Sequence, residues 1–79
     1  MKERIRELLE ENFPDIDFSG DIELIDDGVI DSLSLSVIIA VLTMEFDIMI
    51  PKDEIKVENF NTIDAMAALV ERLKEKNVQ

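Results

Sequence analysis

Residues 31–46, which read DSLSLSVIIAVLTMEF, contain the longest apolar run of the chain and decide the expected fold. Apolar residues recur there at steps of three or four, as on one face of a helix, and this stripe comprises Leu35, Ile38, Ile39, Leu42 and Phe46. Asp31 stands before the stripe as a good N-cap, because its carboxylate can accept backbone hydrogen bonds and suits the positive end of a helix dipole. The segment therefore predicts a helix that starts at Asp31 or Ser32 and ends near Phe46.

An upstream helix is expected over residues 2–13. Its apolar residues have helical spacing and are Ile5, Leu8, Leu9 and Phe13. Pro14 ends this helix, because the residue before a proline is pushed out of the helical region. From Pro14 to Asp31 the chain contains two glycines and scattered apolar residues. We expect a long ordered loop that lays these apolar residues over the core, and loops of this length are more often functional than idle.

Downstream of the central helix, we expect an extended connector over residues 47–51 and a single helical turn over residues 57–60. Thr62 or Asn61 then caps a last helix. The apolar stripe of that helix comprises Ile63, Met66, Ala67, Val70 and Leu73. The sequence thus predicts an all-α fold in one domain over residues 1–79. It is a small antiparallel four-helix bundle of three main helices and one short helix, with a long loop between the first two.

The composition excludes several kinds of chemistry. The 79 residues include no cysteine and no histidine, which removes disulfides, thiolate metal sites, cysteine nucleophiles and histidine general bases. Eight basic residues against nineteen acidic ones give a net charge of −11, which should repel nucleic acids and attract basic protein surfaces. No signal peptide is visible, and the longest apolar run is too short to cross a bilayer. We therefore expect a cytoplasmic protein that binds no nucleic acid.

Residues 15–26 offer a partial match to a calcium-binding loop. The residues that fall on EF-hand loop positions are Asp15, Asp17, Ser19, Gly20, Asp21, Glu23 and Asp26. The match is incomplete because the last position holds an aspartate instead of the longer glutamate, and because Pro14 interrupts the incoming helix. The main interpretation includes no metal. An EF-hand-like calcium-binding module stays open as an alternative, as does a non-catalytic bundle that only binds other proteins.

Ser32 is the most suggestive polar residue at the start of the central helix. Nothing near it in the sequence could take its proton, so we expect no catalytic residue here. Ser32 is better placed as a substrate, because the backbone N–H groups and dipole of a helix N-terminus stabilise an attached phosphate. Local chemistry alone also allows Asp31 and Ser32 to be simple helix caps.

The run LIDDGVIDSL at residues 24–33 resembles the region before the modification site of acyl carrier proteins. The similarity continues through EFDIMIP at residues 45–51 and ENFNTI at residues 58–63, in the order and spacing of that family. This resemblance covers nearly the whole chain. It implies that Ser32 carries a 4′-phosphopantetheine arm from coenzyme A and that Asp31 and Leu33 complete the attachment motif. Ser34 lacks a preceding aspartate and Ser36 lies a full turn inside the helix, so both are weaker candidates.

The resemblance also implies a role and a set of partners. The chain would be a carrier and not an enzyme, and would shuttle acyl or aminoacyl groups as thioesters on the arm's thiol. The implied partners are a phosphopantetheinyl transferase, an acyl- or aminoacyl-loading ligase or transferase, and a downstream acceptor enzyme, with the carrier itself a monomer. The sequence around Ser32 is more similar to that of stand-alone peptidyl or D-alanyl carriers than to that of fatty-acid carriers. The cargo and the pathway (fatty acid, polyketide, nonribosomal peptide or cell-wall modification) stay open.

A second apolar stripe follows the expected central helix beside the first. It comprises Leu33, Val37, Val41, Met44 and Ile48, at positions where fatty-acid carriers typically place a ladder of acidic residues. One interpretation is a partner-binding surface recognised through apolar contact. The other is that a small bundle buries both stripes, or that the second stripe is ordinary apolar surface without a partner.

Overall fold

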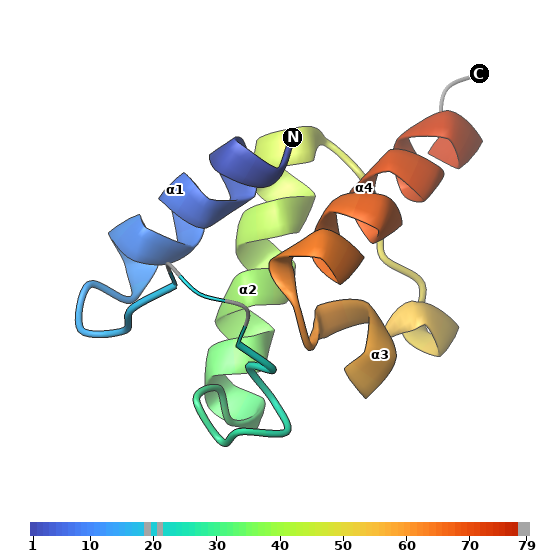
Figure 1. Ribbon diagram of the computed structural model, residues 1–79. Coiled ribbons are helices and arrows are strands. Elements are labelled where there is room, and N and C mark those ends of the chain that lie inside the picture. Colours follow the sequence, from blue (N-terminus) through green and yellow to red (C-terminus); the bar gives the residue numbers. More distant parts are fainter. Residues whose placement is uncertain (19, 21, 78–79) are drawn as a thin grey trace.

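The computed structural model describes residues 1–18, 20 and 22–77, and these residues form helices and connecting loops without a strand. The helices are α1 (Lys2–Asn12), α2 (Ser32–Phe46), the 3-10 helix η1 (Lys52–Glu54), α3 (Val57–Phe60) and α4 (Ile63–Asn77). Figure 1 shows α1, α2 and α4 as the main helices, with the short α3 next to the start of α4. The predicted all-α bundle of three main helices and one short helix is confirmed.

The helix boundaries follow from the local chemistry of the chain. α1 ends one residue before the predicted Phe13, whose N–H still donates to the Leu9 carbonyl at 2.8 Å before Pro14 prevents continuation. α2 ends at Phe46 because Asp47 adopts the left-handed conformation at φ 52°, which aspartate tolerates better than most residues. Thr62 caps α4, and its Oγ1 accepts the N–H of Ala65 at 3.0 Å.

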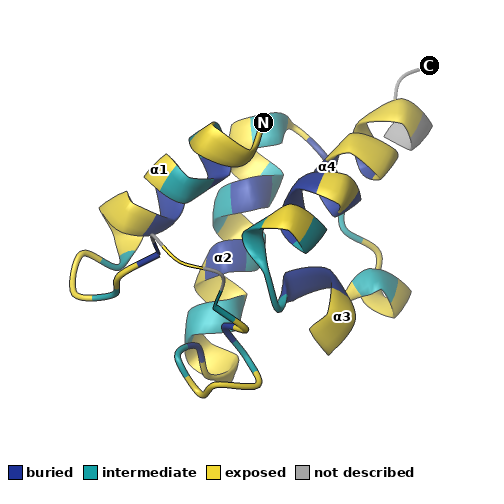
Figure 2. Cartoon of the chain, in the orientation of Figure 1, coloured by how far each residue is buried: buried dark blue, intermediate teal, exposed yellow. Residues whose placement is uncertain are grey.

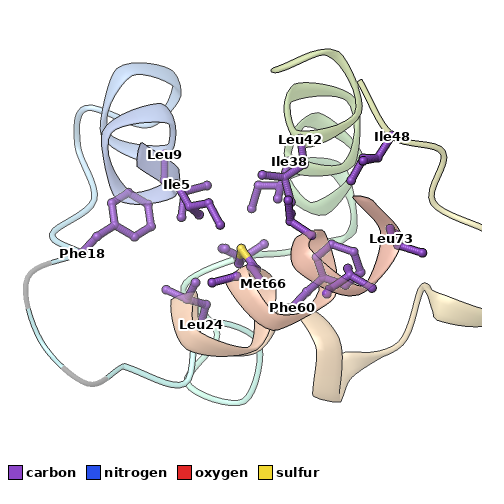
Figure 3. Packing of buried hydrophobic residues seen from close by; sticks show 14 residues of the cluster. Ile5, Leu9, Phe18, Leu24, Ile38, Leu42, Ile48, Phe60, Met66 and Leu73 are labelled. Atoms are coloured by element: carbon purple, nitrogen blue, oxygen red, sulfur yellow. The ribbon is translucent and has the colours of Figure 1, made fainter. Parts of the chain in front are cut away.

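The core lies where α1, α2 and α4 face one another, and α3 closes one end of it. Side chains from every α-helix meet there (Figure 3), and Figure 2 shows the buried faces of the helices turned toward the centre. Among the most deeply buried are Ile5, Leu9, Ile38, Leu42, Phe60, Met66, Leu69 and Val70. Burial of this apolar surface is the main driving force for the fold. None of the helices over the described residues is both long and apolar enough to cross a membrane.

The loop between α1 and α2 takes part in this core, as predicted. Phe18, Leu24 and Ile30 are buried at three separate points of the loop, in the same cluster as the helix side chains. Arg6 on α1 also donates to the Phe18 carbonyl at 3.2 Å. The loop is therefore anchored repeatedly along its length, and its last anchor, Ile30, lies directly before the start of α2.

Candidate modification site

The start of α2 is fixed by a side-chain cap. Asp31 has an extended backbone, and its Oδ1 accepts the N–H of Ser34 at 2.9 Å, while its carbonyl accepts the N–H of Leu35 at 2.9 Å. Ser32, the first helical residue, is exposed, and its hydroxyl makes no hydrogen bond to any residue that the structure describes. The predicted cap is confirmed, and the Ser32 hydroxyl next to it is accessible to a reagent from solvent.

The electrostatics of this helix end combine a negative cap with a positive dipole. Hydrogen bonds from Ser34, first from its backbone N–H, hold the pKa of the Asp31 carboxyl below its ordinary value. Asp31 is therefore ionised at neutral pH beside the positive end of the α2 dipole. Ser36 donates from its hydroxyl to the Ser32 carbonyl at 3.2 Å, so its hydroxyl is occupied one turn inside the helix.

Residues 24–30, called here the preceding turn, set where α2 begins. The Ile30 N–H donates to the Leu24 carbonyl at 2.9 Å and closes the turn between two buried side chains. Within it, the Gly28 N–H donates to the Ile25 carbonyl at 3.0 Å. Gly28 has φ +74°, a left-handed conformation that glycine adopts without strain. The positive φ of this turn thus favours glycine at the position three residues before Asp31.

Asn61, between α3 and α4, holds the preceding turn from across the chain. Its Oδ1 accepts the N–H groups of Ile25 and Asp26 at 2.9 and 3.1 Å, and its Nδ2 donates to Asp26 Oδ2 at 3.0 Å. Its carbonyl also accepts the Leu24 N–H. The sequence indicated Asn61 only as an alternative cap for α4. Thr62 follows Asn61 directly, and one helix needs only one capping side chain. The presence of two adjacent capping residues therefore indicated that one of them, Asn61, bonds elsewhere.

The second apolar stripe divides into an exposed and a buried part. Leu33, Val37 and Met44 are 76%, 38% and 81% exposed, and Val41 between them is half-buried. Ile48 departs from the expected surface, because it is 3% exposed and packs in the core. The left-handed Asp47 turns the chain at the end of α2, so Ile48 does not continue the helical spacing of the stripe. The surface defined by Leu33, Val37, Val41 and Met44 is called the α2 apolar face.

The α2 apolar face has no free charge beside it on its own helix. Glu45 is the one charged residue of α2, and its Oε2 accepts the Nε–H of Arg4 on α1 at 2.8 Å. The Arg4 guanidinium lowers the pKa of the Glu45 carboxyl, and a second carboxylate, that of Glu7, lies 3.1 Å from Arg4 Nη1. A partner that docks on α2 therefore meets an apolar and largely uncharged helix surface.

The candidate calcium loop is not assembled in the described part of the chain. No group of three or more acidic side chains there could hold a metal ion, and Asp26 is occupied by Asn61. Residues 24–30 form turns in place of the exiting helix that an EF-hand needs. Ser19 and Asp21, two of the proposed ligands, lie outside the described residues.

The residues at the start of α2 fit an attached phosphopantetheine group. Ser32 supplies an accessible hydroxyl, and its neighbours Asp31 and Leu33 are exposed, so the attached phosphate would have room at the positive end of α2. No lysine or arginine occurs in residues 7–51, so neither the preceding turn nor α2 supplies a cation of its own to bind the phosphate. A phosphopantetheine group would therefore be held at this end of α2 by a covalent bond to Ser32 and not by an ion pair with these segments.

Comparisons with known proteins agree with this geometry. The family model described as the phosphopantetheine attachment site matches residues 1–70. The D-alanyl carrier protein of Lactococcus lactis subsp. lactis (strain IL1403) is 33% identical over 79 residues, which cover 98% of this chain and 100% of that protein. The D-alanyl carrier protein of Lactococcus lactis subsp. cremoris (strain MG1363) is 32% identical with the same coverage. No solved structure matches the chain significantly.

The Asp31 cap should give stability a specific dependence on pH. Because its pKa is lowered in the folded state, ionised Asp31 stabilises the fold above its ordinary pKa of 3.8, and this contribution is lost as pH falls through the lowered value. Asp31→Asn keeps an oxygen acceptor for the cap but removes the charge. The stability difference between the wild type and Asp31→Asn, measured by urea unfolding, should be present at pH 7 and disappear in the acid range.

Asp53→Asn provides the control for overall charge, since it removes one exposed carboxylate outside the cap from a chain of net charge −11. The cap effect is the part of the Asp31→Asn difference that Asp53→Asn does not reproduce. Equal effects of the two substitutions at every pH would contradict a charge-dependent cap.

Proposed function

Since the chain belongs to the phosphopantetheine attachment-site family, we propose that it is a carrier protein whose arm is attached at Ser32 Oγ and which carries aminoacyl or acyl groups as thioesters. The observation that carries the choice of residue is the exposed Ser32 hydroxyl, which is free of hydrogen bonds to the described residues and directly follows the Asp31 cap. Ser34 is half-buried and the Ser36 hydroxyl is engaged. Carrier proteins of this kind are not enzymes, and the chain contains neither histidine nor cysteine for catalysis of its own.

The attachment uses only the hydroxyl from this chain. Ser32 Oγ loses its proton and forms a phosphodiester bond to the pantetheine phosphate of coenzyme A, as adenosine 3′,5′-diphosphate leaves. A transferase must supply the base, because no residue adjacent to Ser32 in the sequence except the Asp31 carboxylate could accept a proton, and that carboxylate is engaged by Ser34. Once attached at Ser32, the group would supply a terminal thiol that can accept an acyl or aminoacyl group from an activated donor, whose activating group leaves.

The charge distribution around Ser32 suits a carrier that must release its partners. Without lysine or arginine in residues 7–51, the arm's phosphate has no cation on the preceding turn or α2 to bind it, which leaves the arm free to enter an enzyme. The acidic residues before Ser32, among them Asp26, Asp27 and Asp31, would steer basic surfaces toward this end of the molecule. Electrostatic steering of this kind accelerates encounter more than it raises affinity.

We favour D-alanine as the cargo over a fatty-acyl chain. The matched relatives are named D-alanyl carrier proteins, and they align over nearly the entire chain at 32–33% identity. The proposed setting is therefore a monomeric carrier domain in the cytoplasm. It would meet a phosphopantetheinyl transferase, a loading ligase that activates D-alanine, and an acceptor enzyme.

The α2 apolar face is the proposed docking surface for the loading or acceptor enzyme. Leu33, Val37 and Met44 are exposed, and the one carboxylate of the helix, that of Glu45, is paired with Arg4. A complementary partner would thus present an apolar patch to α2 and basic residues to the preceding turn. Fatty-acid carriers, which typically display acidic residues along this helix, would not fit such a patch.

The attachment site is tested by intact mass spectrometry after incubation with coenzyme A and a broad-specificity phosphopantetheinyl transferase. The wild-type chain should gain the mass of one phosphopantetheine group, because it offers one accessible serine after the motif aspartate. Ser32→Ala should gain none. Ser36→Ala should behave as the wild type. A mass increase that survives Ser32→Ala would show that the arm is attached elsewhere.

The docking surface is tested by the double substitution Val37→Glu/Met44→Glu. Exposed helix positions tolerate such changes within about 0.5 kcal/mol, so thermal melting should stay close to the wild type. Loading by the cognate ligase should weaken strongly, because an unpaired carboxylate would be buried against an apolar partner. The matched control is Glu10→Gln/Glu11→Gln, which alters exposed residues of α1.

Phosphopantetheine attachment must be measured separately from loading in this experiment, because a transferase would also have to reach Ser32 at the start of α2. Unfolding of the double variant would mean that these side chains stabilise the core. Undiminished loading of a folded, fully modified double variant would mean that the ligase docks elsewhere.

A further inference from the structure

Asn61 links the junction of α3 and α4 to the preceding turn, which leads to Ser32. Four hydrogen bonds link it to three successive residues of the preceding turn, through its carbonyl, its Oδ1 and its Nδ2. These partners lie 35 or more positions earlier in the sequence. The contact is therefore tertiary, and it fixes the preceding turn against the junction of α3 and α4.

The side chain of Asn61 has no other role within the described residues. Thr62 supplies the cap of α4, so the Asn61 amide is not needed there. Asn59, two residues earlier, makes two side-chain hydrogen bonds, in which its Nδ2 donates to the carbonyl and the Oε1 of Glu54 in η1. The two asparagines thus bind different segments: Asn59 binds η1, and Asn61 binds the preceding turn.

The preceding turn transmits this constraint to Ser32. Leu24 is bonded to Asn61 and buried, and its carbonyl accepts the N–H of Ile30, which is also buried. Ile30 is followed directly by the capping residue Asp31 and then by Ser32. A turn held at both ends in the core can present its exposed face, and the helix start behind it, in one orientation only.

We infer that Asn61 is a positioning residue for phosphopantetheine attachment: it holds residues 24–30 in the orientation that the transferase must contact to reach Ser32. This inference rests on the proposed attachment at Ser32. Asn61 itself contacts neither Ser32 nor the incoming group. It raises the fraction of molecules whose docking surface is in the competent arrangement, so its loss weakens apparent affinity for the transferase more than the chemical step.

The test compares the steady-state kinetics of Asn61→Ala and Asn59→Ala with a phosphopantetheinyl transferase, at a temperature well below both melting points. Both variants lose an asparagine that bridges α3 or its C-terminal junction to another segment, so both should melt below the wild type. Only Asn61→Ala should lose about tenfold in kcat/KM for attachment, carried by a higher KM for the carrier with kcat within about twofold. A general structural role would lower both variants alike, and that result would overturn the inference.

A polarity swap, which exchanges the donor and the acceptor between Asn61 and Asp26, distinguishes a positioning role of this hydrogen bond from direct contact of the transferase with either side chain. This test does not require that Asn61→Ala folds. Asn61→Asp places a carboxylate opposite the Asp26 carboxylate and should impair attachment. The double variant Asn61→Asp/Asp26→Asn restores a donor and an acceptor at the same positions with the net charge of the wild type, and should recover to within about threefold. Asp26→Asn alone keeps an acceptor for Asn61 Nδ2 but removes one steering carboxylate, and its loss of kcat/KM should stay within about threefold of the wild type and below that of Asn61→Asp.

The outcomes distinguish the inference from the proposed function. A wild-type chain that acquires no arm at Ser32 would overturn the proposed function and this inference with it. A wild-type chain that is modified, alongside an Asn61→Ala variant that is modified with unchanged KM, would overturn the inference alone. Failure of the polarity swap to recover activity would also overturn it, because the transferase would then be reading the Asn61 amide or the Asp26 carboxylate itself.

Discussion

The backbone hydrogen bond from Ile30 to Leu24 is the constraint on which the site depends. It closes a turn whose two ends are buried, and it leaves the chain at Asp31 in the extended conformation that a helix cap requires. α2 then starts with Ser32 outside the core and Ile38 inside it. A long loop would normally be the most mobile part of so small a bundle. Here its apolar side chains are part of the core, so the segment that leads to the exposed Ser32 is held in place.

The acidic character of the whole chain contrasts with the nearly uncharged surface of α2. A net charge of −11 gives long-range attraction toward basic partners, but α2 itself contributes a single carboxylate, and Arg4 engages it. In the proposed docking, close contact would fall to the α2 apolar face, where Leu33 and Met44 are the most exposed side chains. Such a division would suit a carrier, because charge accelerates the encounter with a partner and an apolar contact without ion pairs would allow rapid release.

The sequence predicted those features that depend on neighbours along the chain. Helical spacing located α2, and an aspartate before it identified the cap, because both follow from contacts within a few residues. Contacts between distant segments could not be predicted in the same way. Asn61 binds a turn 35 residues away, and the spacing of one helix gives no information about that partner. Helical spacing also places Ile48 on the second apolar stripe, but the left-handed Asp47 ends the helix after Phe46, and Ile48 is buried in the core.

The central claim is that residues 24–30 belong to the folded core and thereby position Ser32. The most direct measurement is amide hydrogen exchange followed residue by residue by NMR. The account predicts that the amides of Leu24 and Ile30, which donate to Asn61 and Leu24, are protected to an extent comparable with Ile38 in the middle of α2. Exchange of Leu24 and Ile30 at the rate of an unstructured peptide, while Ile38 stays protected, would contradict the account, because the serine would then follow a loose loop.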